Sequence, residues 1–448
     1  MAVCLFNCER KQSARPLSEY TPAAADTAFL DTLQRRSFLY FIHETNPANG
    51  LVKDRSTEDS PASIAAVGFA FPAWAIGAER KWIPREDAAW RTLTALRFFW
   101  RAEQSADPLA AGYQGFYYHF LDMKTGKRVW NCELSTVDTG WLIAGIRFAA
   151  QYFNRENPEE QEIRMLADSL TRRVKWDWMT MPDSGKYAST ITMGWRPEEG
   201  FHHMGWVGYN EALLIYVIAA GSNYQGATKA YQQWLGHYDW REPYPALAHA
   251  VFPPLFGHQW SQMFVDFRGL WDDFGREKGI DYFENSRRAT LTQWHYAIEN
   301  PRGWAGYDSL IWGLTACDGP GEAYNTAKHS FLGYAGRGSS GPDLVFFDDG
   351  TIAPTASASS IAFAPEIVLP TLKAMYERYG EKGLWGPYGF RDGFNPTAEW
   401  WGQDYLGIDQ GPIVIMIENY RSGLVWKLMM QDPVIRKGLE VLEFRKKP

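Results

Sequence analysis

Helical segments dominate this 448-residue chain, and the way they are separated constrains the fold more than any other feature. About twelve stretches carry apolar residues at helical spacing, and short turns alternate with long loops rich in Trp, Gly and Asp between them. No strand–helix alternation indicates a parallel sheet. The sequence therefore predicts an all-α fold, an (α/α)6 toroid or barrel with long loops and small β-hairpins at one rim.

The helix boundaries follow from caps, prolines and apolar spacing. The predicted helices are 26–44, 61–79, 85–104, 135–153, 158–178, 211–221, 227–235, 259–267, 280–298, 359–378, 412–420 and 433–442. No composition break marks a linker, so residues 26–448 are predicted to form one catalytic domain after a polar lead-in, residues 1–25. The uncharged stretch 60–78 contains Pro72 and is interpreted as a core helix, not a membrane span.

The N-terminus bears on localisation. Leu5 to Cys8, followed by a polar run, is similar to the end of a lipoprotein leader and its tether, although no complete signal peptide is visible. These features predict a periplasmic protein, with lipid attachment at Cys8 as one route. The other cysteines, Cys4, Cys132 and Cys317, form no CxxC pair, so neither a zinc knuckle nor a disulfide scaffold is predicted.

Composition and charge narrow the ligand class. The net charge is −7 and no basic block occurs, which argues against nucleic acid and anionic membranes as partners. The 21 Trp residues are too many to bury completely, and flat aromatic faces suit the apolar faces of sugar rings. The segment 336–341 matches G-x-G-x-x-G, but Pro342 follows where a dinucleotide fold needs a helix, so it is interpreted as a flexible loop. We expect a neutral ligand, no metal and no cofactor.

The stretch 204–220 carries the strongest catalytic signal. Glu211 stands at the start of a strongly apolar run, where burial raises a carboxyl pKa as a general acid requires. Cleavage of a glycosidic bond needs a second carboxylate to activate water. Asp138 also precedes a long apolar helix, so both residues are expected at the same rim. The further carboxylates in aromatic or glycine-rich settings are Glu133, Asp266, Asp308, Asp318, Glu366, Asp404 and Asp409.

Nine segments carry a resemblance to a known family. They are 115–122, 130–139, 206–211, 258–269, 281–290, 312–320, 350–356, 363–366 and 407–420. In these segments the chain resembles glycoside hydrolase family 144, the bacterial endo-β-1,2-glucanases with a "glucoamylase-like" domain. The resemblance implies a single (α/α)6 barrel that hydrolyses β-1,2-glucan with inversion to short oligosaccharides such as sophorose. It implies Glu211 as the acid and Asp138 as a second essential carboxylate, and leaves the base open, with Asp409 and Glu133 as the other candidates.

The remaining predicted site residues are sugar-binding groups. The proposed stacking platforms are Trp195, Trp206, Tyr209, Trp260, Trp312 and Trp401, and the proposed hydroxyl contacts are His258, Arg268 and Arg287. Alternatives stay open at this point: an exo-acting enzyme that releases sophorose, a transglycosylase, a non-catalytic glucan-binding protein, or a helical toroid that binds other proteins. We expect a monomer.

Overall fold

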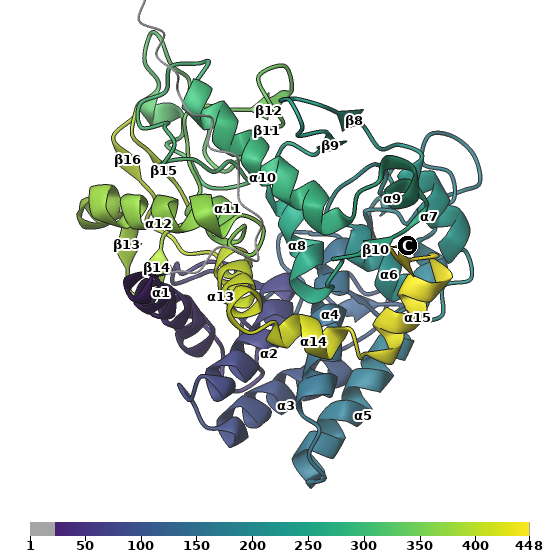
Figure 1. Ribbon diagram of the computed structural model, residues 1–448. Helices are drawn as coiled ribbons and strands as arrows, with labels where there is room; N and C mark the ends of the chain where they lie inside the picture. Colours follow the sequence, from purple (N-terminus) through teal and green to yellow (C-terminus); the bar gives the residue numbers. More distant parts are fainter. Residues whose placement is uncertain (1–22, 448) are drawn as a thin grey trace, which may run out of the picture.

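Two concentric sets of helices form the architecture of residues 23–447, the part of the chain that this computed structural model describes (Figure 1). The inner helices are α2 (Ile64–Glu79), α4 (Thr136–Tyr152), α6 (Leu213–Gly221), α8 (Phe256–Phe264), α11 (Pro354–Ala358) and α13 (Gly407–Arg421). The outer helices are α1 (Ala24–His43), α3 (Arg85–Arg101), α5 (Pro158–Arg173), α7 (Ala227–Leu235), α10 (Tyr282–Glu299) and α12 (Pro365–Tyr379). Outer and inner helices alternate along the chain, which confirms the predicted (α/α)6 fold.

The ring closes between the two ends of the described chain. Purple α1 packs against yellow α13 in Figure 1, and α13 packs against α2. Three further helices are α9 (Asp273–Lys278), α14 (Leu424–Met429) and α15 (Pro433–Val441), and α15 packs against α6. Three one-turn helices span Trp176–Met179, Glu322–Tyr324 and Gly380–Leu384. Between residues 23 and 447, no helix has both the length and the apolar character needed to cross a lipid bilayer.

Burial distinguishes the inner helices from the outer ones. All nine residues of α6 are buried, as are residues 64–77 of α2, which places the uncharged stretch 60–78 in the core as predicted. By contrast, α3 and α5 each bury one face and expose the other. A helix that is apolar on every side is stable only in a core, so the sequences of α2 and α6 predict that these helices belong to the inner ring.

Two glycines allow α2 and α4 to touch through their backbones. A Cβ at Gly145 would lie 1.9 Å from the carbonyl oxygen of Gly68, and a Cβ at Gly68 would lie 2.4 Å from that of Trp141. Neither position has room for a side chain. This contact packs the first turns of α2 directly against the middle of α4.

Short antiparallel strands lie in the loops. β5 (Leu134–Ser135), β6 (Gly194–Arg196) and β7 (Gly200–Phe201) form a three-stranded sheet. The other pairs are β1 (Ala62–Ser63) with β4 (Phe120–Leu121), β2 (Gly112–Tyr113) with β3 (Phe116–Tyr117), β8 (Trp240–Arg241) with β9 (His249–Ala250), β10 (Leu270–Trp271) with β17 (Arg445–Lys446), β11 (Gly338–Ser339) with β12 (Val345–Phe347), β13 (Trp385–Gly386) with β14 (Gly389–Phe390), and β15 (Phe394–Asn395) with β16 (Trp400–Trp401).

The structure corrects several sequence-based expectations. The predicted helix 359–378 corresponds to α12, which begins six residues later at Pro365; α11, just before it, was not predicted, and α13 begins five residues before the predicted start at 412. The segment 336–341 is not a flexible loop, because the side chain of Arg337 is fully buried and bonds to Asp349 at 2.8 Å. Cys4, Cys8 and most of the proposed lead-in lie outside the described residues, and Cys132 and Cys317 are buried free thiols, as expected.

Candidate active site

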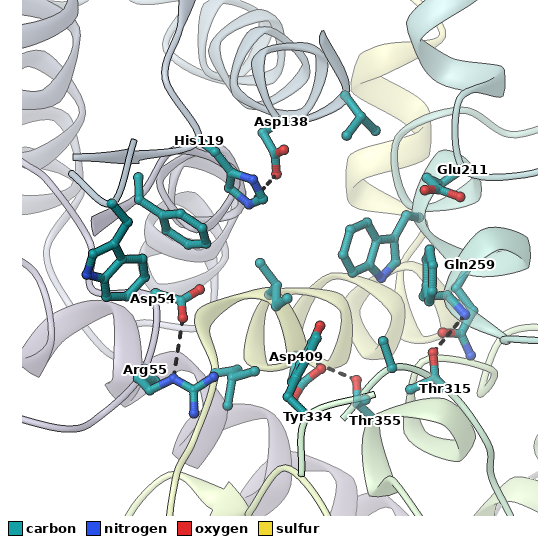
Figure 2. A pocket seen from close by; sticks show the side chains of 18 residues that line it. Asp54, Arg55, His119, Asp138, Glu211, Gln259, Thr315, Tyr334, Thr355 and Asp409 are labelled. Carbon is teal, nitrogen blue, oxygen red and sulfur yellow. Dashed lines mark hydrogen bonds and ion pairs between the residues drawn. The ribbon is translucent and has the colours of Figure 1, made fainter. Parts of the chain in front are cut away.

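A cavity of about 610 Å³ opens where the N-terminal ends of the inner helices converge (Figure 2). Helices α4, α8, α11 and α13 each contribute residues from their first turns, and the loops before them supply the rest. Four carboxylates, two other charged side chains and several aromatic rings share its wall. The lining residues are Asp54, Arg55, His119, Phe120, Trp130, Val137, Asp138, Glu211, Phe256, Gln259, Trp260, Thr315, Ala316, Tyr334, Thr355, Leu406, Ile408 and Asp409.

Glu211 is a buried carboxyl group at the start of α6, where the chain enters the barrel. The Ser261 hydroxyl donates to the backbone carbonyl of Glu211 at 2.8 Å and fixes this position. The side-chain Oε2 atom is buried without a hydrogen-bond partner. Burial, and to a smaller extent the charge of Asp138, raise the pKa of Glu211 to about 7, against a backbone hydrogen bond that lowers it. A carboxyl group of this kind keeps its proton near neutral pH and can donate it.

Asp138 lies in the first turn of α4 beside a charged histidine. The Ser135 hydroxyl caps the helix by accepting from the Asp138 N–H at 3.2 Å, and it also donates to the Asp138 carboxylate. His119 Nε2 is 3.5 Å from Asp138 Oδ1, and His119 Nδ1 is 3.0 Å from Glu133 Oε1. Burial acts to lower the pKa of His119, but the carboxylates of Asp138 and Glu133 raise it to about 9. His119 is therefore an imidazolium between two carboxylates.

Glu133 is held in its ionised form. Burial acts to raise its pKa, but the hydrogen bond and charge of His119, together with Arg196, lower the pKa of Glu133 to about 2. Within residues 23–447, His119, Glu133 and Asp138 also place three donor atoms within 4.8 Å of one another. These groups neutralise one another as ion pairs, and Arg196 occupies the second oxygen of Glu133 at 3.1 Å.

Asp409 lies in the first turn of α13 against a second carboxyl group, Asp392. Both are buried, and Oδ2 of Asp409 and Oδ1 of Asp392 have no donor partner. Burial raises the pKa of Asp409, and the charge of Asp392 and their mutual hydrogen bond raise it further. Two carboxyl groups in contact satisfy each other only when they share a proton.

A further charged group lines the same side of the cavity. Arg55 Nη1 is 3.1 Å from Asp318 Oδ2 and 3.5 Å from Asp404 Oδ2, and Arg55 Nε is 3.5 Å from Asp54 Oδ2. Burial raises the pKa of Asp54, and the Arg55 charge lowers it. Arg55 thus balances part of the negative charge that collects around Asp409.

Comparison with known proteins assigns the chain to a family. The model of a family described as "Putative glucoamylase" matches residues 203–433, about half of the chain. The chain belongs to this family. A putative glucoamylase from Bacteroides uniformis is 33% identical with a TM-score of 0.81, over 95% of this chain and 99% of that one. Membership of this family confirms the resemblance inferred from the sequence.

Two relatives have names that state an activity. An endo-β-1,2-glucanase from Chitinophaga pinensis, solved with sophorotriose and glucose, is 29% identical with a TM-score of 0.81, over 95% of this chain and 99% of that one. A curated protein from Parabacteroides distasonis, named exo β-1,2-glucooligosaccharide sophorohydrolase (non-reducing end), is 28% identical over 98% of this chain. This chain spans 61% of the length of that relative.

Four of the sugar-binding residues predicted for this family member are core residues. Trp312 is 1% exposed and its indole N–H donates to Thr371 at 2.6 Å. Tyr209 and His258 are buried against each other with ring centroids 4.8 Å apart, and the pKa of His258 is lowered by burial. Arg287 is buried and bonds to Glu366 at 2.6 Å. None of these four side chains lines the cavity.

The other predicted sugar-binding residues lie in different places, and only one of them lines the main cavity. Trp260 lines the cavity itself. Trp206 is 8% exposed and borders a smaller adjoining cavity of about 240 Å³ that also contains Asp138. Trp195 borders another small cavity beside β6, and Trp401 is half-buried in β16. Arg268 pairs with Asp266 at 2.7 Å and lines a separate depression, away from the carboxylates.

Among the cavity residues that the sequence interpretation missed are Asp54, His119, Trp130 and Tyr334. Asp392 behind Asp409 was missed as well. Three of them could have been suspected, because Trp130 and His119 lie in quoted or adjoining aromatic segments and Asp54 stands in a charged loop before an apolar helix. For Tyr334, no local signal distinguishes it from the other tyrosines.

Proposed function

We propose that this protein is a glycoside hydrolase that cleaves β-1,2-glucan. The observation that carries the proposal is Glu211, a buried carboxyl group with an unpartnered oxygen and a pKa raised to about 7, in a cavity that holds three more carboxylates. The names of the Chitinophaga and Parabacteroides relatives support β-1,2-glucan as the substrate. A non-catalytic glucan-binding protein is less well supported, because binding a neutral ligand does not require a carboxyl group with a raised pKa together with three further carboxylates in the same cavity.

The proposed reaction is a single displacement. Glu211 donates its proton to the glycosidic oxygen as the bond from that oxygen to C1 breaks, and a water molecule forms the new bond to C1 from the opposite face. The water gives its proton to a carboxylate, and the configuration at C1 inverts. Two groups remain candidates for this base: Asp409, which shares a proton with Asp392, and Asp138, which is paired with the His119 cation. Glu133 is a weaker candidate, because it is bonded to both His119 and Arg196.

Endo action is proposed, with exo release of sophorose as the alternative. The Chitinophaga relative is named as an endo enzyme and the Parabacteroides relative as an exo enzyme. A time course of products separates the two, because a mixture of sizes early in the reaction indicates endo cleavage and a single disaccharide indicates exo cleavage. We further propose a monomer that acts in the periplasm.

The test is hydrolysis of linear β-1,2-glucan, with β-1,3-glucan and α-1,4-glucan as controls. We expect cleavage of the β-1,2-glucan alone, with the α-anomer formed first. Activity confined to α-1,4-glucan would reject the proposed substrate, and binding without turnover in the wild-type protein would reject the proposed enzyme.

A further inference from the structure

Two large aromatic side chains in the cavity are exposed to solvent. Among residues 23–447, twelve large hydrophobic side chains are exposed, and Trp130 and Tyr334 are the two of these that line the cavity. Trp130 is 68% exposed and Tyr334 is 54% exposed. Apolar surface left open inside a concave site commonly marks the place where a ligand binds.

Trp130 is held in an unfavourable backbone conformation. Its φ is 57°, and that of Asn131 is 49°, so two successive residues lie in the left-handed region. This region suits Asn but is costly for a bulky residue such as Trp. The ring gains little burial in return, since it packs only edge-on against Phe120, with centroids 5.1 Å apart. Strain without burial indicates that the position serves a ligand rather than the fold.

Trp130 is linked to the carboxylate network through one intervening ring. Phe120 stacks on His119 with centroids 4.0 Å apart and an interplanar angle of 9°. His119 in turn pairs with Asp138. A sugar that lies against Trp130 is therefore adjacent to the Asp138 side of the cavity.

Tyr334 projects from a loop that is fixed on both sides of it. The buried guanidinium of Arg337 donates to the carbonyl oxygens of Leu332 and Gly333, each at 3.1 Å. Ala335 and Cys317 exchange two backbone hydrogen bonds of 3.1 Å. The ring of Tyr334 thus stands in the cavity on a backbone that is already ordered, which lowers the entropy cost of binding.

The surroundings of Tyr334 place it beside the other carboxylate pair. Figure 2 shows Tyr334 next to Asp409 at the edge of the cavity. Burial of the side chain within the cavity raises the pKa of Tyr334, and the charges of Asp392, Asp409 and Asp54 raise it as well. The hydroxyl therefore stays protonated and can donate to a sugar hydroxyl while the ring face remains free.

We propose that Trp130 and Tyr334 are sugar-stacking residues of the site, Trp130 on the Asp138 side and Tyr334 on the Asp409 side. The inference rests on the proposed function, because it takes a β-1,2-linked glucose chain as the ligand. Two platforms beside different carboxylates would hold glucose units in separate subsites.

Calorimetric titration with a β-1,2-glucooligosaccharide tests this proposal, in a Glu211→Gln background that binds without turnover. We expect Trp130→Ala and Tyr334→Ala each to weaken binding by roughly tenfold, the usual scale for truncating a buried aromatic contact. Tyr334→Phe keeps the ring and should bind within about threefold of the parent. The matched controls are Trp90→Ala on the outer helix α3, 49% exposed, and Tyr324→Ala on the Tyr334 loop, 43% exposed. Both should bind like the parent, and thermal unfolding confirms that each variant is folded.

The outcomes separate the two proposals. If Trp130→Ala and Tyr334→Ala bind like the two controls while the wild-type protein hydrolyses β-1,2-glucan, the assignment of the platforms is rejected and the function stands. If the wild-type protein does not hydrolyse β-1,2-glucan and the Glu211→Gln parent does not bind the oligosaccharide, both proposals are rejected.

Discussion

Asp392 and Asp409 contact each other as two buried carboxyl groups, with Asp409 in the wall of the cavity and Asp392 behind it. Each has one oxygen without any other donor. Burial raises the pKa of both groups; Asp392 raises the pKa of Asp409 further, whereas the hydrogen bond with Asp409 lowers the pKa of Asp392. The Asp318 backbone N–H donates to Asp392 Oδ2 at 2.6 Å, and the Asp318 carboxylate faces Arg55. Tyr334, Cys317 and Asp54 complete the ionisable groups around the pair. Asp409 can act as a base only in the state in which the pair has lost a proton.

Replacement of Asp392 should therefore change the acid side of the pH profile. In Asp392→Asn the amide donates to Asp409 without titrating, so the pKa of Asp409 falls and the base stays ionised at lower pH. We expect the acid limb of kcat/KM to move to lower pH by about one unit or more. Asp404→Asn, which also removes a carboxylate near Arg55, is the control. An acid limb that does not move in Asp392→Asn would assign the base to another group.

Glu211 should control the alkaline side of the same profile. A general acid must be protonated, and its pKa is raised to about 7, so activity should fall as the pH rises through about 7. Glu211→Gln should lower kcat by about 10²–10⁴-fold while oligosaccharide binding is retained. A substrate with an activated leaving group needs no proton from the enzyme and should recover part of the rate. Turnover of the variant close to that of the wild type would remove Glu211 from the mechanism.

His119 should make the stability of the protein depend on pH. Its folded pKa is raised to about 9 from an unfolded value of about 6.5. The contribution to stability is therefore complete below about pH 6.5 and is lost as the pH rises through about 9. We expect the free energy of unfolding to fall by about 1–3 kcal/mol across this window, allowing for solvent around the ring. Denaturant unfolding of His119→Gln should lack this decline, and the same decline in both proteins would contradict the ion-pair role.

Gly145 should tolerate no side chain. A Cβ there would meet the Gly68 carbonyl oxygen at 1.9 Å, so Gly145→Ala must separate α2 from α4. We expect a loss of about 1–3 kcal/mol or more of unfolding free energy, as in other overpacked cores. Gly380→Ala is the control, because its Cβ would meet a side chain at an ordinary 3.4 Å. Equal stabilities of the two variants would show that the helix crossing can adapt.

The helical pattern predicted the fold well because the inner helices are apolar on every side. The stretches around residues 64–77 and 213–221 have no polar face, and only the inner ring of a two-layer helical fold accepts such segments. One boundary shifted at a proline inside a helix, since α13 begins at Gly407 and contains Pro412, whereas α12 continues through Pro370 as predicted. The predicted helix start at Pro412 was wrong because an inner helix can accommodate proline near its first turn.

The sequence located the carboxylates of the cavity better than it located the aromatic side chains that line it. Glu211, Asp138 and Asp409 each precede or begin an inner helix, so their place at one end of the barrel follows from the order of the chain. The assignment of their catalytic roles stays a prediction. The direction in which an aromatic side chain points has no comparable local signal, and so Trp312 and Tyr209 proved to be core residues while Trp130 and Tyr334 were missed.

Local sequence was sufficient for the helices, their inner or outer position, and the carboxylate at the entrance to α6, since all three depend on apolar periodicity and chain order. Asp392 pairs with Asp409, and His119 pairs with Asp138 and Glu133. In each pairing the residues come from separate segments of the chain, and these segments meet only in the folded barrel. Their protonation states follow from that meeting, because burial and neighbouring charge, not the residue type, set each pKa. Glu211 therefore becomes a credible acid only in the folded cavity, where water is removed from its carboxyl group.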